Sequence, residues 1–159
     1  MTYAAPSTSR EVRFATAPPG HHDEPGDKSI DAAADGARLK ILIVEDEFFI
    51  ALDNQAQVED LGHTVVGIAA SAEQAIRMAE RDRPDVVLMD IRLNGSVDGI
   101  DAAAAIRDRY AIGSIFITAN TDSGTLQRAR RINPLGILEK PLVQIRLRDL
   151  LAQVSRRNA

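Results

Sequence analysis

The stretch Asp85-Val86-Val87-Leu88-Met89-Asp90 decides the fold of this chain, because its apolar run ends on a carboxylate. A short, unbroken apolar run after Pro84 predicts a strand buried on both faces, as in a parallel sheet. In open α/β sheets, ligands bind outside the carboxyl ends of the strands, so Asp90 lies where a binding site is expected. An aspartate at the end of one isolated strand is more often a cap for the next turn, so the other strand ends must decide.

Strand and helix patterns alternate on both sides of this run. Buried-strand patterns cover residues 39–44, 64–69, 85–89, 113–118 and 135–139. Helix patterns cover residues 48–61, 71–82, 100–109, 122–132 and 142–155. Parallel strands joined by right-handed helical crossovers predict an α/β fold, a doubly wound, five-stranded parallel sheet of the flavodoxin-like type with strand order 2-1-3-4-5.

Two of the predicted helices carry clear local signals. The first contains apolar residues near helical spacing: Phe49, Leu52, Ala56 and Leu61. Gly62 follows this helix as a suitable C-terminal cap residue. The second helix opens with Ser71-Ala72-Glu73-Gln74, which matches a capping box.

Length and composition narrow the functional class. The chain of 159 residues is long enough for one domain with a substantial core. Its net charge of -4 argues against nucleic-acid binding through bulk positive charge, and the lack of cysteine excludes disulfides and thiolate chemistry. No apolar run approaches the roughly 18 residues of a membrane span, and the N-terminus lacks the apolar core of a signal peptide. We therefore expect a cytoplasmic protein with no membrane association.

The ends of the chain differ from its middle. Residues 1–38 are rich in polar residues and proline and hold few apolar groups, which predicts a disordered N-terminal extension. The adjacent pair His21-His22 is expected to be solvated rather than metal-binding. The domain is expected over residues 39–156, with a short tail at 157–159. Because neither end has room for an effector domain, we expect a stand-alone domain without direct DNA binding.

The ends of four predicted strands carry residues that suit one chemistry. Glu45 and Asp46 follow the first strand, Asp90 follows the third, Thr118 ends the fourth, and Lys140 follows the fifth. Neighbouring carboxylates raise each other's pKa unless a cation is present, and hard oxygen ligands suit Mg²⁺. A lysine adds a fixed positive charge, and a threonine hydroxyl can donate to an oxyanion. Together these groups suit transfer of a phosphoryl group to an aspartate.

Four motifs at these strand ends resemble the signature of the receiver domain of bacterial two-component response regulators. They are Val44-Glu45-Asp46-Glu47, Leu88-Met89-Asp90, Ile117-Thr118-Ala119 and Glu139-Lys140-Pro141. The resemblance implies that Asp90 is the phosphoacceptor and that Thr118 and Lys140 are the catalytic and switch residues. It also implies an Mg²⁺ cofactor held by Asp46, Asp90 and the backbone carbonyl of Arg92, with Glu45 acting through water. The Lys140–Pro141 peptide bond would be cis.

The resemblance further implies a single-domain response regulator, phosphorylated by a sensor histidine kinase in an Mg²⁺-dependent phosphorelay. Its role would be that of a shuttle, a sink or a docking switch, with a phosphotransfer protein or a second copy of the chain as further partners. Such a protein catalyses its own phosphorylation and dephosphorylation but is not an enzyme with a separate substrate. Two alternatives are a pseudo-receiver that binds partners without phosphorylation and a metal-dependent phosphatase of another α/β family. The four intact motifs disfavour the first, and the lack of a second-substrate motif disfavours the other.

Three departures from the family pattern concern switching. The loop after Asp90 lacks the usual proline, and its Asp98-Gly99 pair comes one residue late. Ile137 stands where the family usually has an aromatic switch residue. The segment Phe116-Ile117-Thr118-Ala119-Asn120 partly matches the FATGUY subclass, which lacks that aromatic residue and is met alongside HWE/HisKA2-type histidine kinases. We therefore expect a kinase of this type as partner, and activation that reorders the loop around Asn120 and the start of the next helix.

The last two predicted helices carry a concentration of positive charge in a chain that is net acidic. The arginines are Arg128, Arg130, Arg131, Arg146 and Arg148. Any one of them is expected to be an ordinary solvated side chain. As a group beside the strand ends, they are candidates for docking an acidic partner or a second receiver.

Overall fold

The computed structural model describes residues 37–119 and 122–158, which lie in one compact unit. The predictions for residues 1–36, including the His21-His22 pair, and for Asn120 concern parts of the chain outside these ranges. None of the helices in the described ranges is long and apolar enough to cross a membrane.

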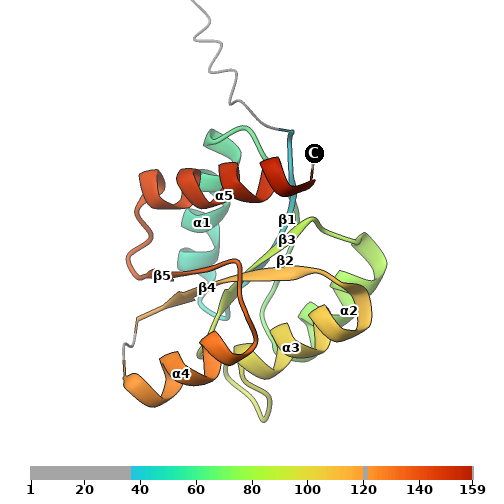
Figure 1. Ribbon diagram of the computed structural model, residues 1–159, viewed down its shortest axis with the longest axis vertical. Helices are drawn as coiled ribbons and strands as arrows, with labels where there is room; N and C mark the ends of the chain where they lie inside the picture. Colours follow the sequence, from blue (N-terminus) through green and yellow to red (C-terminus); the bar gives the residue numbers. More distant parts are fainter. Residues whose placement is uncertain (1–36, 120–121, 159) are drawn as a thin grey trace, which may run out of the picture. The chain divides into compact units, whose positions relative to one another are not determined.

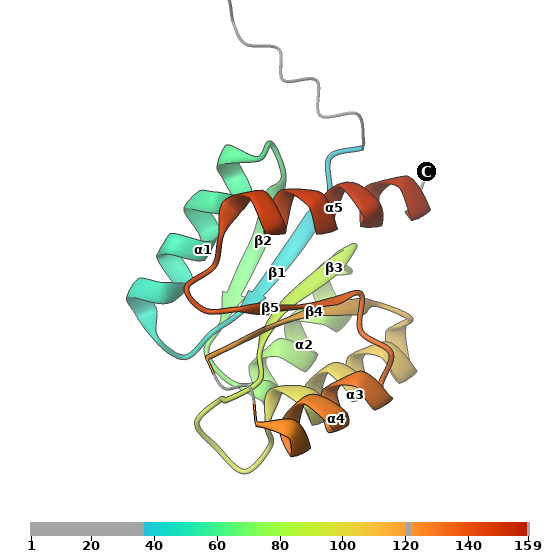
Figure 2. The same ribbon diagram turned by 60° about the vertical axis from the view of Figure 1, so that its left-hand side comes forward.

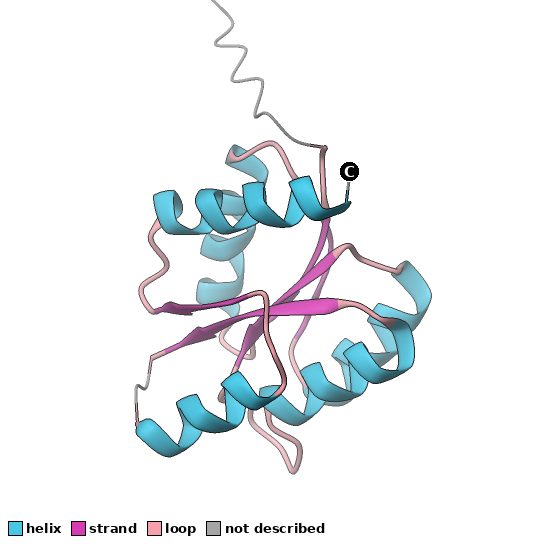
Figure 3. Cartoon of the chain, in the orientation of Figure 1, coloured by secondary structure: helices cyan, strands magenta, loops and turns pink. Residues whose placement is uncertain are grey.

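Five parallel strands form a single sheet in the order β2-β1-β3-β4-β5, which confirms the predicted topology. Figure 3 shows the strands of this sheet with helices on both sides. The strands are β1 (Lys40–Val44), β2 (Thr64–Ala69), β3 (Val86–Asp90), β4 (Gly113–Thr118) and β5 (Gly136–Glu139). The helices are α1 (Phe48–Asp60), α2 (Ala72–Asp82), α3 (Gly99–Tyr110), α4 (Ser123–Arg131) and α5 (Gln144–Asn158). Helix α5 extends two residues beyond the predicted end of the domain at residue 156.

Alternating side chains of the buried strands build a separate core on each face of the sheet. Leu42, Val87 and Phe116 face the side covered by α2, α3 and α4, whereas Ile43 and Leu88 face the side covered by α1 and α5 (Figure 1). All five of these side chains are fully buried. The continuous apolar runs are therefore explained by burial on both faces, as in other parallel sheets.

Ser71 and Gly62 cap α2 and α1 as predicted, but the Gln74 side chain binds the N–H of Ala70 instead of that of Ser71. The Ser71 hydroxyl accepts a hydrogen bond from the Gln74 backbone N–H at 3.2 Å, and the Gln74 side chain accepts one from Ala70 N–H at 2.9 Å. Gly62 adopts a φ of 85°, the left-handed region that favours glycine after a helix. The Ser71 bond pairs an N–H group at the start of α2, and the Gly62 N–H donates to the carbonyl of Glu59 near the end of α1 at 2.9 Å.

The spacing of apolar residues predicted the first helix, but it does not identify the side of α1 that is buried. Phe49 is 83% exposed and Leu52 is 41% exposed, while the buried face of α1 is formed by Ala51, Asn54 and Val58. The rotation of α1 about its axis is set by its packing on the sheet, and apolar spacing alone does not reveal which side is covered. The consequence is an exposed apolar surface at the start of α1, where the Phe48 and Phe49 rings also touch edge to face.

A buried histidine makes the stability of the fold depend on pH. His63 is 8% exposed, and its Nδ1 accepts a hydrogen bond from the Leu39 backbone N–H at 3.2 Å. Burial, with a contribution from the Arg38 charge, lowers the pKa of His63. As the pH falls, His63 is therefore protonated at a higher pH in the unfolded chain than in the folded protein. The stabilisation is complete above the ordinary pKa of about 6.5 and is lost as the pH falls from there to the lowered value.

We expect the free energy of unfolding to fall by about 1 kcal/mol below pH 6.5, the worth of the hydrogen bond that protonated Nδ1 cannot accept. Urea unfolding at a series of pH values between 7.5 and 5 measures this change. The matched control is His63→Gln, which retains an acceptor but does not titrate. An identical slope in the variant would assign the pH dependence to other groups.

Candidate functional site

Three carboxylates meet where β1 and β3 end side by side. Asp90 is the last residue of β3, and Glu45 and Asp46 directly follow β1, whose Val44 lies opposite Met89. One carboxylate oxygen from each of Glu45, Asp46 and Asp90 lies within 4.8 Å of the others. Glu45 and Asp90 are buried, whereas Asp46 is half-buried. The predicted convergence of these three side chains is therefore confirmed.

Lys140 brings a positive charge into this cluster from beyond the end of β5. Its Nζ lies 2.8 Å from Glu45 Oε2 and 2.9 Å from Asp90 Oδ2, and its side chain is 14% exposed. Burial by itself would lower the pKa of Lys140, but hydrogen bonds to Asp90 and Glu45 outweigh it and raise that pKa. The ammonium is therefore held charged, directly against the carboxylate of Asp90. The Lys140–Pro141 peptide bond that follows is cis, as the resemblance implied.

Glu45 is the most deeply buried acid of the cluster. Burial raises its pKa, and the nearby Asp90 charge adds to the rise, while the bonds from Lys140 and from the Glu47 backbone N–H oppose it. A carboxylate in this position gains from any additional positive charge. Its environment therefore favours a cation beside Asp46 and Asp90.

The loop between β3 and α3 fastens onto two of the carboxylates through its backbone. The Arg92 N–H donates to Asp90 Oδ1 at 3.0 Å, and the Asn94 N–H donates to Asp46 Oδ2 at 3.0 Å. The sequence had pointed to the carbonyl of Arg92, and the role of the Arg92 and Asn94 amides was missed. Backbone donors carry no side-chain signature, so no sequence pattern could have identified them.

Thr118 lies at the same edge of the sheet as the carboxylates. It ends β4 opposite Glu139, its side chain is buried, and its backbone carbonyl accepts a hydrogen bond from the Lys140 N–H at 2.9 Å. This last contact ties the segment that carries Lys140 to the end of β4. Ile137, three residues before Lys140, is half-buried and packs against the core on the side of the sheet covered by α2, α3 and α4.

Gly99 explains the Asp-Gly pair that follows the loop. A Cβ atom added there would lie 1.9 Å from the backbone carbonyl oxygen of Asp90, a distance that no carbon atom tolerates. The Gly99 N–H also donates to the carbonyl of Ile91 at 3.0 Å. The start of α3 therefore packs directly on the backbone of the phosphoacceptor candidate, and only glycine leaves room.

We expect Gly99→Ala to lower the free energy of unfolding by roughly 3 kcal/mol, because the backbone must move to relieve the overlap. Chemical denaturation measures the loss. Gly124→Ala in α4 is the matched control, since its Cβ would meet nothing closer than Asp122 Oδ1 at 3.5 Å. Equal stability of the two variants would contradict the close approach of Gly99 to Asp90.

The donor set at this site fits a divalent cation. Glu45, Asp46 and Asp90 offer only oxygen atoms, and hard oxygen ligands are the ones that Mg²⁺ prefers. Three carboxylates beside one ammonium leave an excess of negative charge for a cation to neutralise. Since Asp46 remains half-buried, the cluster is also open to solvent on one side.

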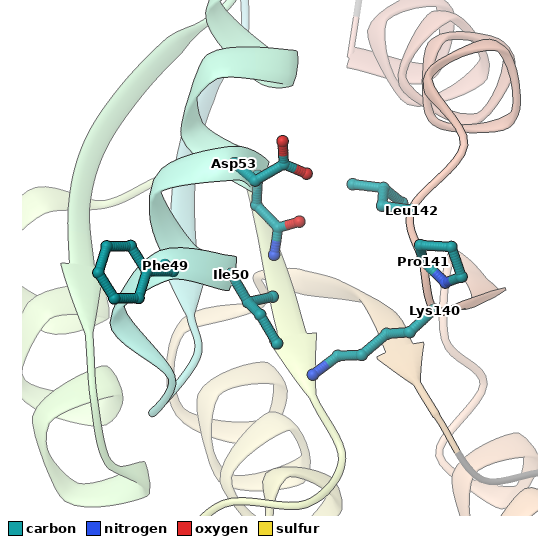
Figure 4. A pocket seen from close by; sticks show the side chains of 7 residues that line it. Phe49, Ile50, Asp53, Lys140, Pro141 and Leu142 are labelled. Atoms are coloured by element: carbon teal, nitrogen blue, oxygen red, sulfur yellow. The ribbon is translucent and has the colours of Figure 1, made fainter.

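A groove of about 510 Å³ opens beside Lys140, between α1 and the segment after β5 (Figure 4). Its walls are mainly apolar and are formed by Phe49, Ile50, Asp53, Asn54, Lys140, Pro141 and Leu142. In Figure 4 the Lys140 side chain runs along the floor toward α1, with Ile50 on the facing side. The groove therefore leads from the exposed apolar surface of α1 to the charged cluster.

Comparisons with known proteins agree with this geometry. Residues 41–152 match the family model described as the response regulator receiver domain. The chain is 36% identical over 124 residues to the phyllosphere-induced regulator PhyR of Methylorubrum extorquens, covering 77% of this chain and 45% of PhyR. It is 33% identical over 102 residues to the transcriptional regulatory protein PdtaR of Mycobacterium tuberculosis, covering 64% of this chain and 49% of PdtaR. The chain thus spans about half the length of the curated relatives it matches.

Solved structures show the same fold. The signal receiver domain of a modulated diguanylate cyclase from Desulfovibrio desulfuricans is 37% identical and superposes with a TM-score of 0.72, over 76% of this chain and 96% of that one. PhyR from Bartonella quintana, described as an anti-anti-sigma factor, is 32% identical with a TM-score of 0.66, over 79% of this chain and 52% of that one.

Proposed function

The chain belongs to the response regulator receiver family, and from that premise we propose that it accepts a phosphoryl group on Asp90 from a sensor histidine kinase. The observation that carries the proposal is the contact of Lys140 Nζ with Asp90 Oδ2 inside a cluster of three carboxylates. A lysine bound to a buried aspartate supplies the positive charge that a phosphoryl group attached to that aspartate needs.

The described residues support specific roles in phosphoryl transfer. A carboxylate oxygen of Asp90 attacks phosphorus, and the bond between phosphorus and the donor histidine nitrogen breaks. The Arg92 N–H holds the Asp90 carboxylate in one orientation, and Lys140 neutralises charge on the phosphoryl oxygens. Thr118, at the end of the neighbouring strand, donates its hydroxyl to a phosphoryl oxygen. Positioning and charge neutralisation account for most catalysis of this reaction.

Mg²⁺ is the cofactor of this proposal. Asp46, Asp90 and the backbone carbonyl of Arg92 would hold it, with Glu45 assisting through water. When bound, it supplies the positive charge that balances the phosphoryl oxygens. Hydrolysis of the aspartyl phosphate by water then returns the protein to its starting state, so the domain would need no second substrate.

The groove beside Lys140 supports delivery of the phosphoryl group by a protein helix. Its apolar walls continue onto the exposed side chains of Phe48 and Phe49, which are 68% and 83% exposed. An amphipathic helix that buries this surface would bring a histidine side chain to the open side of the cluster. The proposed donor is a histidine kinase of the HWE/HisKA2 type.

The proposed pathway role is that of a cytoplasmic shuttle, sink or docking switch whose output passes through protein contacts rather than DNA. The description of one relative as an anti-anti-sigma factor supports output through a protein partner. A pseudo-receiver is the less favoured alternative, because Asp46, Asp90, Thr118 and Lys140 are all present at the same edge of the sheet.

The test uses a small acyl phosphate in place of the kinase. Incubation with acetyl phosphate and Mg²⁺ is expected to add the mass of one phosphoryl group, and chelation of Mg²⁺ is expected to prevent the gain. Beryllofluoride, which mimics an aspartyl phosphate, should bind only when Mg²⁺ is present. Failure of both reagents with folded protein would refute phosphoacceptor function and leave the pseudo-receiver.

A further inference from the structure

Helix α4 is held to the domain by few contacts. Of its nine residues, only Ala129 is buried. Figures 1 and 2 show α4 lying alongside α3 from both directions of view. Polar ties between these two helices therefore carry more weight in placing α4 than they would in a deeply packed helix.

One of these ties is formed by Arg128, which binds the carboxylate of Asp98, the cap of α3, and that of Asp101 in its first turn. Its Nη1 lies 2.8 Å from Asp98 Oδ2, and its Nη2 lies 3.3 Å from Asp101 Oδ1. Arg128 therefore differs from the solvated side chain expected from its exposed helical position. A second tie joins the Arg107 guanidinium of α3 to the carbonyl of Ile132 at the end of α4.

The Asp98 side chain is also held by the backbone of α3, independently of Arg128. Its Oδ1 accepts hydrogen bonds from the backbone N–H groups of Ile100 and Asp101, both at 3.0 Å, so it caps the N-terminus of α3. Burial by itself would raise the pKa of Asp98, but the bonds from Arg128 and from the α3 backbone outweigh it and lower that pKa. An already ordered carboxylate loses little further conformational freedom when it binds an arginine.

Asp98 also terminates the loop that touches the charged cluster. The same loop places the Arg92 N–H on Asp90 and the Asn94 N–H on Asp46. The next residue, Gly99, packs on the Asp90 backbone. One end of this short segment is therefore bound to the two carboxylates, and the other end is bound to α4 through Arg128.

We propose that Arg128 is a positioning residue that couples the phosphoacceptor loop to helix α4. The Arg128–Asp98–Asp101 contact holds the loop in the arrangement that presents its amides to Asp90 and Asp46, and it transmits changes in that loop to α4. The proposal rests on the proposed function, because it assigns the route by which phosphorylation of Asp90 reaches α4. It requires no aromatic side chain at position 137.

The size of the coupling follows from the exposure of the pair. Arg128 is 47% exposed on its side chain and Asp98 is 32% exposed, so this contact has the strength of a surface ion pair. Such a strength corresponds to a two- to fivefold change in an equilibrium, by the usual range for exposed pairs. Linkage requires that the change be reciprocal. Loss of the contact should loosen α4 by this factor and weaken ligand binding at Asp90 by at most the same factor.

The test compares Arg128→Gln with Arg131→Gln. Both variants remove one positive charge from α4, but among the described residues Arg131 forms no ion pair. Amide exchange in residues 122–131 should be about two- to fivefold faster in Arg128→Gln than in the wild type. The affinity for beryllofluoride in the presence of Mg²⁺ should fall measurably, by at most the same factor, while Arg131→Gln matches the wild type in both measurements. The remaining Arg107 tie should keep α4 folded.

A third variant, Asp101→Asn, should give an intermediate effect on amide exchange and on beryllofluoride affinity. Asp101→Asn removes only the longer arm of the contact, so its exchange and affinity should fall between those of the wild type and Arg128→Gln. Unchanged exchange and affinity in Arg128→Gln, with normal beryllofluoride binding by the wild type, would overturn the coupling and leave the proposed function intact. A wild type that does not bind beryllofluoride would overturn the proposed function itself, and the coupling with it.

Discussion

Replacement of Asp90 by asparagine is expected to abolish phosphorylation by acetyl phosphate while the protein stays folded. An amide cannot act as the nucleophile that a carboxylate provides. The shape of the side chain is retained, its Oδ1 can still accept the Arg92 N–H, and Lys140 keeps its 2.8 Å contact with Glu45. Mass spectrometry after incubation with acetyl phosphate and Mg²⁺ measures the loss, and thermal unfolding checks that the fold is retained.

Asp46→Asn is the matched control for this prediction. It removes one carboxylate from the same cluster but leaves Asp90 in place. We expect phosphorylation to survive in this variant and to require a higher Mg²⁺ concentration, because a charged ligand is lost. Undiminished phosphoryl uptake by Asp90→Asn would show that another side chain is the acceptor.

Replacement of Lys140 by methionine is expected to lower both stability and the rate of phosphorylation. The variant leaves Glu45 and Asp90 buried beside each other without the ammonium that lies 2.8 and 2.9 Å from them. Removing one partner of a buried ion pair lowers the free energy of unfolding by roughly 3 kcal/mol. Loss of one preorganised stabilising group should slow phosphorylation by on the order of 10²-fold.

The same variant should respond more strongly to Mg²⁺. With the ammonium gone, a divalent cation becomes the main positive charge available to the carboxylates, so Mg²⁺ should raise the Tm of Lys140→Met more than that of the wild type. Lys40→Met is the matched control, because Lys40 is an exposed residue of β1 away from the cluster. Identical Mg²⁺-induced changes in Tm for the wild type and Lys140→Met would contradict a shared site for the metal and the lysine.

The sequence was sufficient to predict the fold because its signals are strong and local. Apolar runs without polar breaks, such as Val86 to Met89, can be satisfied only by burial on both faces of a sheet. The alternation of such runs with helical segments then indicates a doubly wound parallel sheet with right-handed crossovers, of which the order 2-1-3-4-5 is a common form. The observed order of strands agrees with that reasoning.

The candidate site was predictable for a related reason. Parallel strands end at the same edge, so residues that directly follow different strands meet there, whatever their separation along the chain. Glu45 and Lys140 lie 95 positions apart and are in contact at 2.8 Å. Residues that follow the strands could therefore be placed together from the sequence, and the charged cluster was predicted in this way.

Other features depend on how elements rotate and pack, and these only the tertiary structure decided. The spacing of Phe49 and Leu52 indicated a helix but not which side of it would be covered, and both side chains proved exposed. The glycine at position 99 is required by the backbone of Asp90, which approaches it from another element.

The contact of Arg128 with Asp98 belongs to the same class, because it joins α4 to the cap of α3 across 30 positions, and no local pattern specifies how these two helices are placed. By itself, the sequence determined the alternation of buried strands with helices and the residues gathered at the strand ends, since burial and strand direction act on every residue of an element alike. The tertiary structure decided the exposed face of α1 and the tie between α3 and α4. These depend on the rotation and spacing of whole helices, which are set by the sum of many weak contacts.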